Sequence, residues 1–147
     1  MGFDMIASVY RRNKETQEYE KMAFYDKDGK ELNDIFPTRD GMLNQLLVGY
    51  NRHGYDFEAI GAYRGMPDWY DDQDSEGTYY DYLELRGWAQ GNACEYIDWM
   101  ANYDEEDGPP KRNALKDFIE QVNMYLYAYG IYYPKPGEVI VICEMSY

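Results

Sequence analysis

Carboxylate side chains are concentrated in one stretch of the chain, from Met66 to Asp107. These 42 residues hold 13 of the 28 acidic residues and a single base, Arg86. The other 105 residues hold 15 acids and 13 bases, so −12 of the net charge of −14 arises in this stretch. Carboxylates can transfer protons, bind metal ions or attract a cationic partner. This uneven distribution is the main functional signal of the sequence.

The segment Asp72–Gly77 begins like a calcium-binding loop. Oxygen-bearing side chains stand at its first, third and fifth positions, and glycine stands at the sixth. The twelfth position of such a loop supplies a bidentate Glu, but here it is Leu83, and Glu84 follows one residue late. The pattern favours weak binding of divalent cations by an acidic loop, and we predict no resident metal or cofactor.

Other residues with catalytic potential lack suitable neighbours. The single histidine, His53, is near Asp56 and Glu58 in a polar segment, where a lone histidine is typically exposed. Cys94 and Cys143 fit neither a CxxC pattern nor a zinc spacing, so we expect both to be reduced and buried. No phosphate-binding loop or dinucleotide fingerprint is present. We predict no catalytic residue, although a small carboxylate- or metal-dependent hydrolase stays as an alternative.

Charge and hydropathy exclude several classes of partner. A net charge of −14 argues against direct binding of nucleic acid and against attraction to anionic lipid. The chain has no run of about 18 apolar residues, the length needed to span a bilayer. Residues 1–10 do not resemble a secretory signal, so we expect a cytoplasmic protein. The 18 tyrosines exceed what the core needs, which predicts that some are exposed.

Hydrophobic periodicity predicts strands at both ends of the chain. Asp4–Tyr10 and Tyr19–Tyr25 alternate as half-buried strands, and the polar Arg11–Glu18 connects them as a hairpin. Five consecutive apolar residues within Glu138–Met145 predict a central strand covered on both faces.

Helices are predicted between these strands. A short helix capped by Thr38 or Asp40 should end near Gly49, and Tyr79–Tyr103 shows helical spacing with a kink or split at its glycines. The clearest helix runs from the cap Asn113 to Gly130. Residues 54–67 are not assigned. The predicted fold is a single α+β domain over residues 1–147, with a small antiparallel or mixed sheet and three or four helices packed on one face.

The acidic stretch is predicted to form a partner-binding surface. It also carries nine of the 26 aromatic residues, and tyrosine rings beside evenly spaced carboxylates resemble bases beside phosphates. We expect residues 68–78 to be an exposed loop and the next acids to project from a helix face. The residues expected to contact the partner are Asp68, Trp69, Tyr70, Asp71, Asp72, Asp74, Glu76, Tyr79, Tyr80, Asp81, Glu84, Glu95, Asp98, Asp104, Glu105, Glu106 and Asp107.

In size and in the placement of Asp, Glu and Tyr over residues 68–107, the chain resembles the small acidic inhibitors of phages and mobile elements. These are the anti-CRISPR and anti-restriction proteins. The resemblance includes no sequence motif, and no family residues are carried over. It implies a non-catalytic protein that occupies the basic groove of a host nuclease as a nucleic-acid mimic. Other members of this class act by allostery or by forcing dimerisation, so these modes are alternatives to groove mimicry. A separate alternative is an accessory protein whose acidity gives solubility only.

Basic residues are most frequent near the predicted hairpin. Lysines on an edge strand commonly prevent aggregation between sheets, and this is the favoured interpretation. The alternative is a homodimer in which this basic edge meets the acidic region of a second copy. The residues concerned are Arg11, Arg12, Lys14, Lys21, Lys27 and Lys30.

Overall fold

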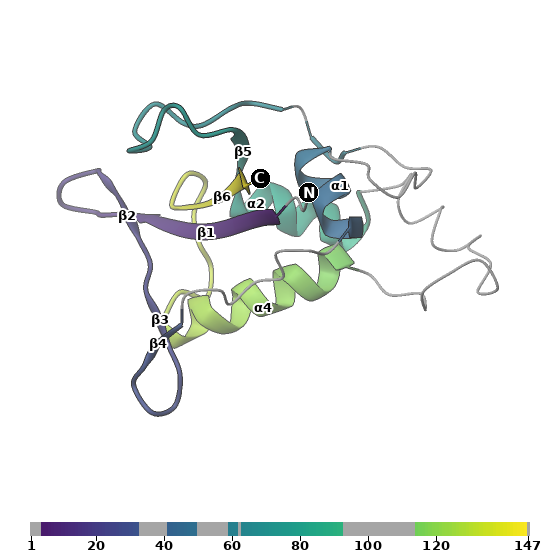
Figure 1. Ribbon diagram of the computed structural model, residues 1–147. Helices are drawn as coiled ribbons and strands as arrows, with labels where there is room; N and C mark the ends of the chain where they lie inside the picture. Colours follow the sequence, from purple (N-terminus) through teal and green to yellow (C-terminus); the bar gives the residue numbers. More distant parts are fainter. Residues whose placement is uncertain (1–3, 33–40, 50–58, 62, 93–113, 147) are drawn as a thin grey trace.

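The computed structural model describes residues 4–32, 41–49, 59–61, 63–92 and 114–146 (Figure 1). The strands are β1 (Asp4–Arg12), β2 (Tyr19–Lys21), β3 (Phe24–Tyr25), β4 (Glu31–Leu32), β5 (Gly77–Asp81) and β6 (Val139–Ser146). Four of them form an antiparallel sheet with the order β2-β1-β6-β5, and a two-stranded sheet pairs β3 with β4. The helices are α1 (Gly41–Val48), α2 (Tyr82–Gly87), the π-helical segment η1 (Trp88–Asn92) and α4 (Ala114–Ala128). The predicted α+β class is confirmed.

The helices pack on one face of the four-stranded sheet. Val9, Val141 and Tyr80 are directly opposite one another in β1, β6 and β5, so their side chains point to this face. All three belong to the hydrophobic core. The helical residues in the same core include Leu43, Leu46 and Leu47 of α1, Leu85 of α2, and Phe118, Val122 and Leu126 of α4.

Strand β6 is central and covered on both faces, as its apolar run predicts. It pairs with β1 over eight positions and with β5 over five. Val141 faces the helices, and Ile142, which points to the opposite face, is also fully buried. The thiol of Cys143 is buried in this strand, and burial raises its pKa to about 12, which keeps it protonated and unreactive. Cys94 lies outside the described residues.

The prediction of a helix from Tyr79 is wrong. Residues 77–81 form β5 instead, and the helix begins at Tyr82 after a capping box formed by Asp81 and Glu84. Gly77 lets β5 approach β6, because a Cβ there would lie 2.3 Å from the backbone oxygen of Cys143. At Gly87, one of the glycines where a kink or split is predicted, α2 passes without interruption into the π-helical segment η1, so the described residues show a change of helix type there.

The second predicted strand, Tyr19–Tyr25, is divided between two sheets. Its first three residues form β2 beside β1, and Phe24 and Tyr25 form β3, which turns away to pair with β4. Residues 26–30 form a turn, with Gly29 at a φ of 81° and the Asp26 carboxylate accepting the backbone N–H of Asp28 and of Lys30. Among the described residues, no helix is long and apolar enough to cross a bilayer.

Candidate functional site

The acidic loop, defined as residues 67–76, lies against the face of the sheet that the helices leave uncovered. Tyr10 is opposite Ile140, on the reverse of Val9 and Val141. Trp69 packs on this face, with its ring stacked on Tyr19 at a centroid distance of 4.4 Å and 5.1 Å from the ring of Tyr10. The loop is therefore anchored to β1 and β2 by an aromatic cluster.

Polar contacts fix the path of the acidic loop. The side-chain amide of Gln73 donates to the carbonyl oxygens of Pro67 at 2.9 Å and of Tyr70 at 2.6 Å. The hydroxyl of Tyr70 donates to the carboxylate of Glu144 on β6 at 2.7 Å. These bonds tie Gln73 to the first residues of the loop, and they tie Tyr70 to the sheet.

Asp72 and Ser75 close the turn of the loop. The Asp72 carboxylate accepts the backbone N–H of Asp74 at 3.1 Å. The Ser75 hydroxyl lies 2.8 Å from an oxygen of Asp72 and 2.9 Å from an oxygen of Glu144, and it can donate its one proton to either. The turn therefore has a defined shape before any partner binds.

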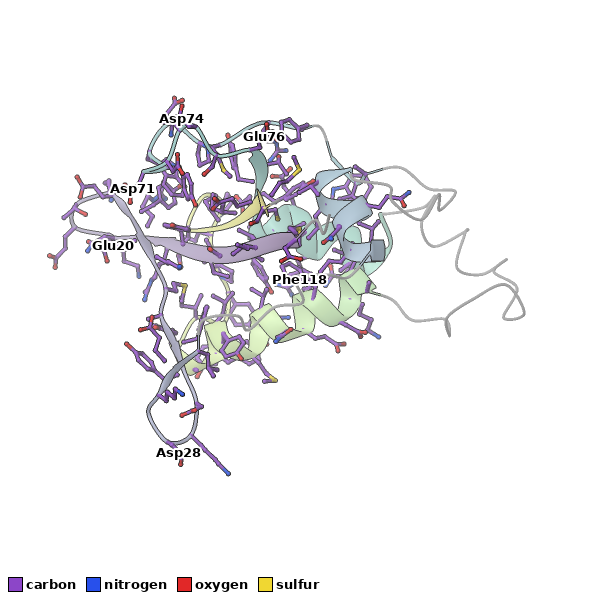
Figure 2. The ribbon with its side chains drawn as sticks, viewed as in Figure 1. Glu20, Asp28, Asp71, Asp74, Glu76 and Phe118 are labelled. Carbon is purple, nitrogen blue, oxygen red and sulfur yellow. The ribbon has the colours of Figure 1, made fainter. Side chains whose placement is uncertain are left out.

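Five carboxylates of this loop face solvent. The five exposed acids are Asp68, Asp71, Asp72, Asp74 and Glu76. None of the first four forms an ion pair with a lysine or arginine among the described residues. Figure 2 shows Asp74 projecting outward from the loop, away from the sheet. The five acids form the most concentrated negative charge that the described part of the chain shows.

Two tyrosines, Tyr70 of this loop and Tyr10 in contact with it, have raised pKa values. Burial first, and then the nearby carboxylates of Asp71 and Glu144, raise the pKa of Tyr10. Burial, followed by the hydrogen bond to Glu144, raises the pKa of Tyr70. Both phenols stay neutral at physiological pH, so they add no negative charge.

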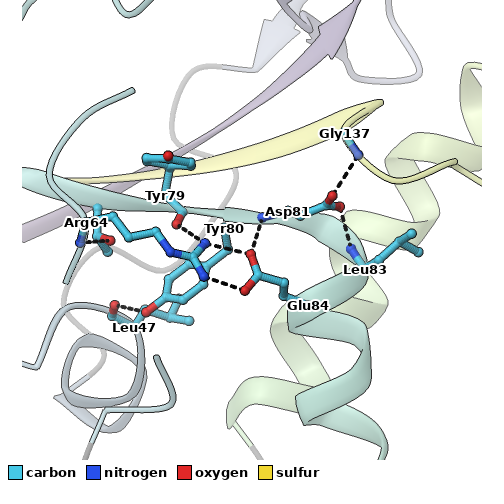
Figure 3. A network of polar contacts seen from close by, with 9 residues as sticks. Leu47, Arg64, Tyr79, Tyr80, Asp81, Leu83, Glu84 and Gly137 are labelled. Carbon is cyan, nitrogen blue, oxygen red and sulfur yellow. Dashed lines mark hydrogen bonds and ion pairs between the residues drawn. The ribbon is translucent and has the colours of Figure 1, made fainter. Parts of the chain in front are cut away.

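Asp81 does not belong to the exposed surface that the sequence predicts. Because β5 extends to this residue, Asp81 caps α2 instead of lying on a helix face. Its carboxylate accepts the backbone N–H of Leu83 at 3.0 Å and the backbone N–H of Gly137 at 2.7 Å (Figure 3). The role of Asp81 is to join α2 to the turn before β6.

Glu84 is paired within the chain. Arg64 forms two charge-assisted hydrogen bonds to it, at 2.6 Å and 2.5 Å, and a Glu84 oxygen also accepts the backbone N–H of Asp81 at 3.0 Å (Figure 3). The hydrogen bond from Arg64 is the largest cause of the lowered pKa of Glu84. Arg64 also lies over the rings of Tyr79 and Tyr80. The charge of Glu84 is thus neutralised locally.

Tyr80 was also expected to contact the partner, and this is wrong. Its side chain is 1% exposed, and its hydroxyl donates to the carbonyl oxygen of Leu47 at 2.5 Å. Tyr79, which points to the opposite face of β5, is half-buried. Strand alternation explains the difference between these adjacent tyrosines.

Several predicted residues lie outside the described residues. They are Glu95, Asp98, Asp104, Glu105, Glu106 and Asp107 of the expected surface, together with His53, Asp56 and Glu58. Of the 13 acids in the stretch, the described part therefore brings together the five of the loop and separates Asp81 and Glu84 from them.

Sequence reasoning missed three residues that shape the site: Arg64, Gln73 and Glu144. Arg64 stands in the segment that was not assigned, and its pairing with Glu84 spans 20 residues. The Asp81–Glu84 spacing is itself a capping-box pattern, and it could have placed the helix start at Tyr82. Nothing in the local sequence signals the contact of Glu144 with the loop.

Two observations concern metal and substrate binding. Within the described residues, no group of three or more His, Cys, Asp or Glu side chains is arranged to hold a metal ion. A hollow of about 60 Å³ lies between β1 and the β3–β4 hairpin, lined by residues that include Ser8, Lys21 and Glu31. Ligand pockets usually measure at least about 300 Å³, so this hollow is too small for an organic substrate.

No protein-family model, curated protein or solved structure matches this chain.

Proposed function

We propose that this protein is a non-catalytic inhibitor that docks its acidic loop into the basic groove of a nucleic-acid-binding enzyme. The partner class is a defence nuclease of a bacterial host, such as a CRISPR effector or restriction enzyme, met in the host cytoplasm. The observation that carries the proposal is the set of five exposed carboxylates on one braced loop. Such a loop presents negative charge as a polynucleotide does.

The bracing of the loop supports this proposal energetically. A loop that is ordered only on binding loses conformational entropy at that moment, and this loss weakens affinity. Here Trp69 and Gln73 already hold the backbone through stacking and hydrogen bonds. The carboxylates are therefore presented in a fixed array, which favours rapid association with a cationic groove.

The aromatic residues of the loop have a different role from the one expected. Trp69 and Tyr70 bind the sheet, so they position the carboxylates instead of inserting into a partner. In this mechanism Asp71, Asp72 and Asp74 attract the partner's lysines and arginines. The alternative, an accessory protein whose acidity serves solubility only, assigns no such role to these three residues.

The test neutralises the loop and compares it with an equal neutralisation elsewhere. The loop variant carries Asp71→Asn, Asp72→Asn, Asp74→Asn and Glu76→Gln. The asparagine introduced at position 72 keeps an oxygen that can accept the N–H of residue 74, so the turn is preserved. The control variant, with the same net charge, carries Glu15→Gln, Asp28→Asn, Asp117→Asn and Glu120→Gln, all at exposed positions.

The measurement is affinity capture from a bacterial host lysate at about 50 mM and about 500 mM NaCl, followed by kinetics with the captured nuclease. We expect wild type and control to capture a basic nucleic-acid-binding protein at low salt and to release it at high salt. The loop variant should associate at least about tenfold more slowly. Equal association of the loop and control variants would exclude the acidic loop as the binding surface.

A further inference from the structure

A second distinctive surface lies at the C-terminal end of α4. Residues 121–134 contain no Asp, Glu, Lys or Arg, although charged residues make up 29% of the chain. In Figure 1 this helix forms the lower side of the molecule, whereas the acidic loop lies along the upper side. The two surfaces are therefore separate, and an inference about this one does not rest on the proposed function.

Large side chains of this uncharged segment are unusually exposed. Met124 is 66% exposed, Tyr132 is 58% exposed and Tyr133 is 87% exposed. Tyr127, at 54%, places its ring 5.2 Å from that of Tyr132. We call Met124, Tyr127, Tyr132 and Tyr133 the tyrosine face. Tyr129, which packs on Phe24, lies next to it in sequence.

The core does not require this arrangement. The buried stripe of α4 consists of other residues, among them Phe118, Val122 and Leu126. Tyrosine and methionine are enriched at protein–protein interfaces, and charged residues are depleted at interface centres. The tyrosine face has this composition, whereas an ordinary solvated helix face would carry charges.

We propose that two copies of this chain associate through the tyrosine face, as an isologous dimer about a twofold axis. Two copies of the chain, each with a net charge of −14, repel each other in most relative orientations. A segment without charge is where two copies can meet with the least repulsion. In a twofold interface the same surface contacts itself, so Tyr132 and Tyr133 of one copy would pack on those of the other.

A basic partner does not suit this face. Its lysines and arginines would lose water on binding, and residues 121–134 supply no carboxylate to compensate for that loss. A neutral aromatic surface, by contrast, needs no such compensation. The chain itself provides one.

The available area agrees with a weak, reversible dimer. Taking about 200 Å² for a fully exposed large side chain, the tyrosine face and Tyr129 offer roughly 600 Å² per copy. A stable interface usually buries about 800 Å² per partner. Contacts from the rim of the face would bring the dimer near the lower end of this size class.

The test is sedimentation velocity over a concentration series from about 5 to 500 µM, at about 50 mM and about 500 mM NaCl. We expect the wild type to shift from monomer to dimer as concentration rises. Because salt screens the repulsion between two anionic molecules, the dissociation constant should fall several-fold at the higher salt concentration. A dimer that joins the basic hairpin to the acidic loop would respond in the opposite direction.

The variant Tyr132→Ser/Tyr133→Ser should remain monomeric under both conditions. Both side chains are exposed, so its circular dichroism spectrum should match that of the wild type. The matched control is Ile6→Ser on β1, which is 38% exposed on the sheet face that the helices leave uncovered, and it should dimerise as the wild type does. A monomeric wild type at all concentrations, dimerisation that weakens with salt, or undiminished dimerisation of the double variant would each overturn the proposal.

Discussion

Glu84 illustrates how one contact changes the role of an acidic residue. Its carboxylate accepts hydrogen bonds from two guanidinium nitrogens of Arg64 and from the backbone N–H of Asp81. An acid engaged in this way stabilises the chain and is not available to a partner. Arg64, on the opposite side of the pair, connects β5 to α2 by also donating to the carbonyl oxygen of Tyr79 at 3.2 Å.

Replacing Glu84 with glutamine tests this structural role. Glu84→Gln keeps an acceptor for the N–H of Asp81 but removes the charge that Arg64 binds. The side chains of Arg64 and Glu84 are 33% and 36% exposed, so solvent screens the pair. We expect the free energy of unfolding in urea to fall by about 1 kcal/mol. The control Asp74→Asn, at an exposed loop position, should leave this free energy unchanged.

The pH dependence of the same variant gives an independent check. Arg64 lowers the pKa of Glu84 in the folded state below its ordinary value of 4.5. The stabilisation is therefore complete above the unfolded-state pKa and is lost as the pH falls through the lower, folded-state value. The difference in unfolding free energy between wild type and Glu84→Gln should be constant from pH ~7 to ~5.5 and shrink towards pH ~3. A constant difference down to the lowest pH would contradict this assignment.

At the scale of elements, strand β6 and helix α4 could be predicted from sequence because their signals are local. Five consecutive apolar residues at 139–143 indicate a strand buried on both faces. The stripe that includes Phe118, Val122 and Leu126 follows the helical period, and Gly130 stops the helix with a φ of 76°. In both elements, burial in the structure follows the sequence pattern.

Strand β5 could not be predicted with the same ease, because two signals overlap there. Tyr82 and Leu85 have helical spacing, and extending this spacing backwards included Tyr79 and Tyr80 in the helix. The structure instead uses them in a strand, where Thr78 and Tyr80 are buried and Tyr79 points to the other face. The pairing of β5 with β6 is a contact between distant residues, which no local pattern reveals.

The candidate site was predictable to the extent that its charge is local in sequence. The five exposed acids of the loop follow one another over nine residues, so sequence alone identifies them. The neutralisation of Glu84 and the burial of Tyr80 depend instead on Arg64 and Leu47, which are distant in the chain. The support given to the loop by Tyr10 and Tyr19 depends on tertiary packing in the same way.

The acidic loop, as an element, depends on Trp69. Trp69→Ala removes the ring that stacks on Tyr19, and a stacked pair contributes about 1 kcal/mol beyond its buried area. We expect the free energy of unfolding to fall by about 2 kcal/mol. Binding to the captured nuclease should weaken about fivefold, because the loop must then be ordered on binding.

The salt dependence of binding distinguishes this effect from a loss of charge. Trp69→Ala removes no carboxylate, so the slope of log affinity against log salt should equal that of the wild type. The loop variant, which removes four carboxylates, should instead show a smaller slope. Tyr133→Ser serves as the aromatic control, and it should change neither stability nor nuclease binding because its side chain is 87% exposed. A changed slope in Trp69→Ala would show that the ring does more than hold the loop.

At the scale of the whole molecule, the net charge of −14 makes folding itself sensitive to salt. Repulsion among like charges destabilises a compact state, and salt screens it over a Debye length of about 10 Å at 0.1 M. Ion pairs such as that of Arg64 with Glu84 act in the opposite direction, but within the described ranges Asp68, Asp71, Asp72 and Asp74 form no such pair. Screening of repulsion should therefore dominate.

We accordingly expect the urea midpoint of unfolding to rise when NaCl is raised from about 20 mM to about 500 mM. At an unchanged m-value, the rise should correspond to a gain of about 1 kcal/mol in the free energy of unfolding. The variant neutralised in the acidic loop should gain less from salt than the control neutralised at four acids outside the loop, because the loop acids are the most densely clustered and close charges repel most strongly. A midpoint that falls with salt would mean that attractive pairs outweigh this repulsion. In that case the exposed carboxylates of the acidic loop would not be the dominant electrostatic feature of the folded chain, and the proposal that they bind a basic groove would lose its support.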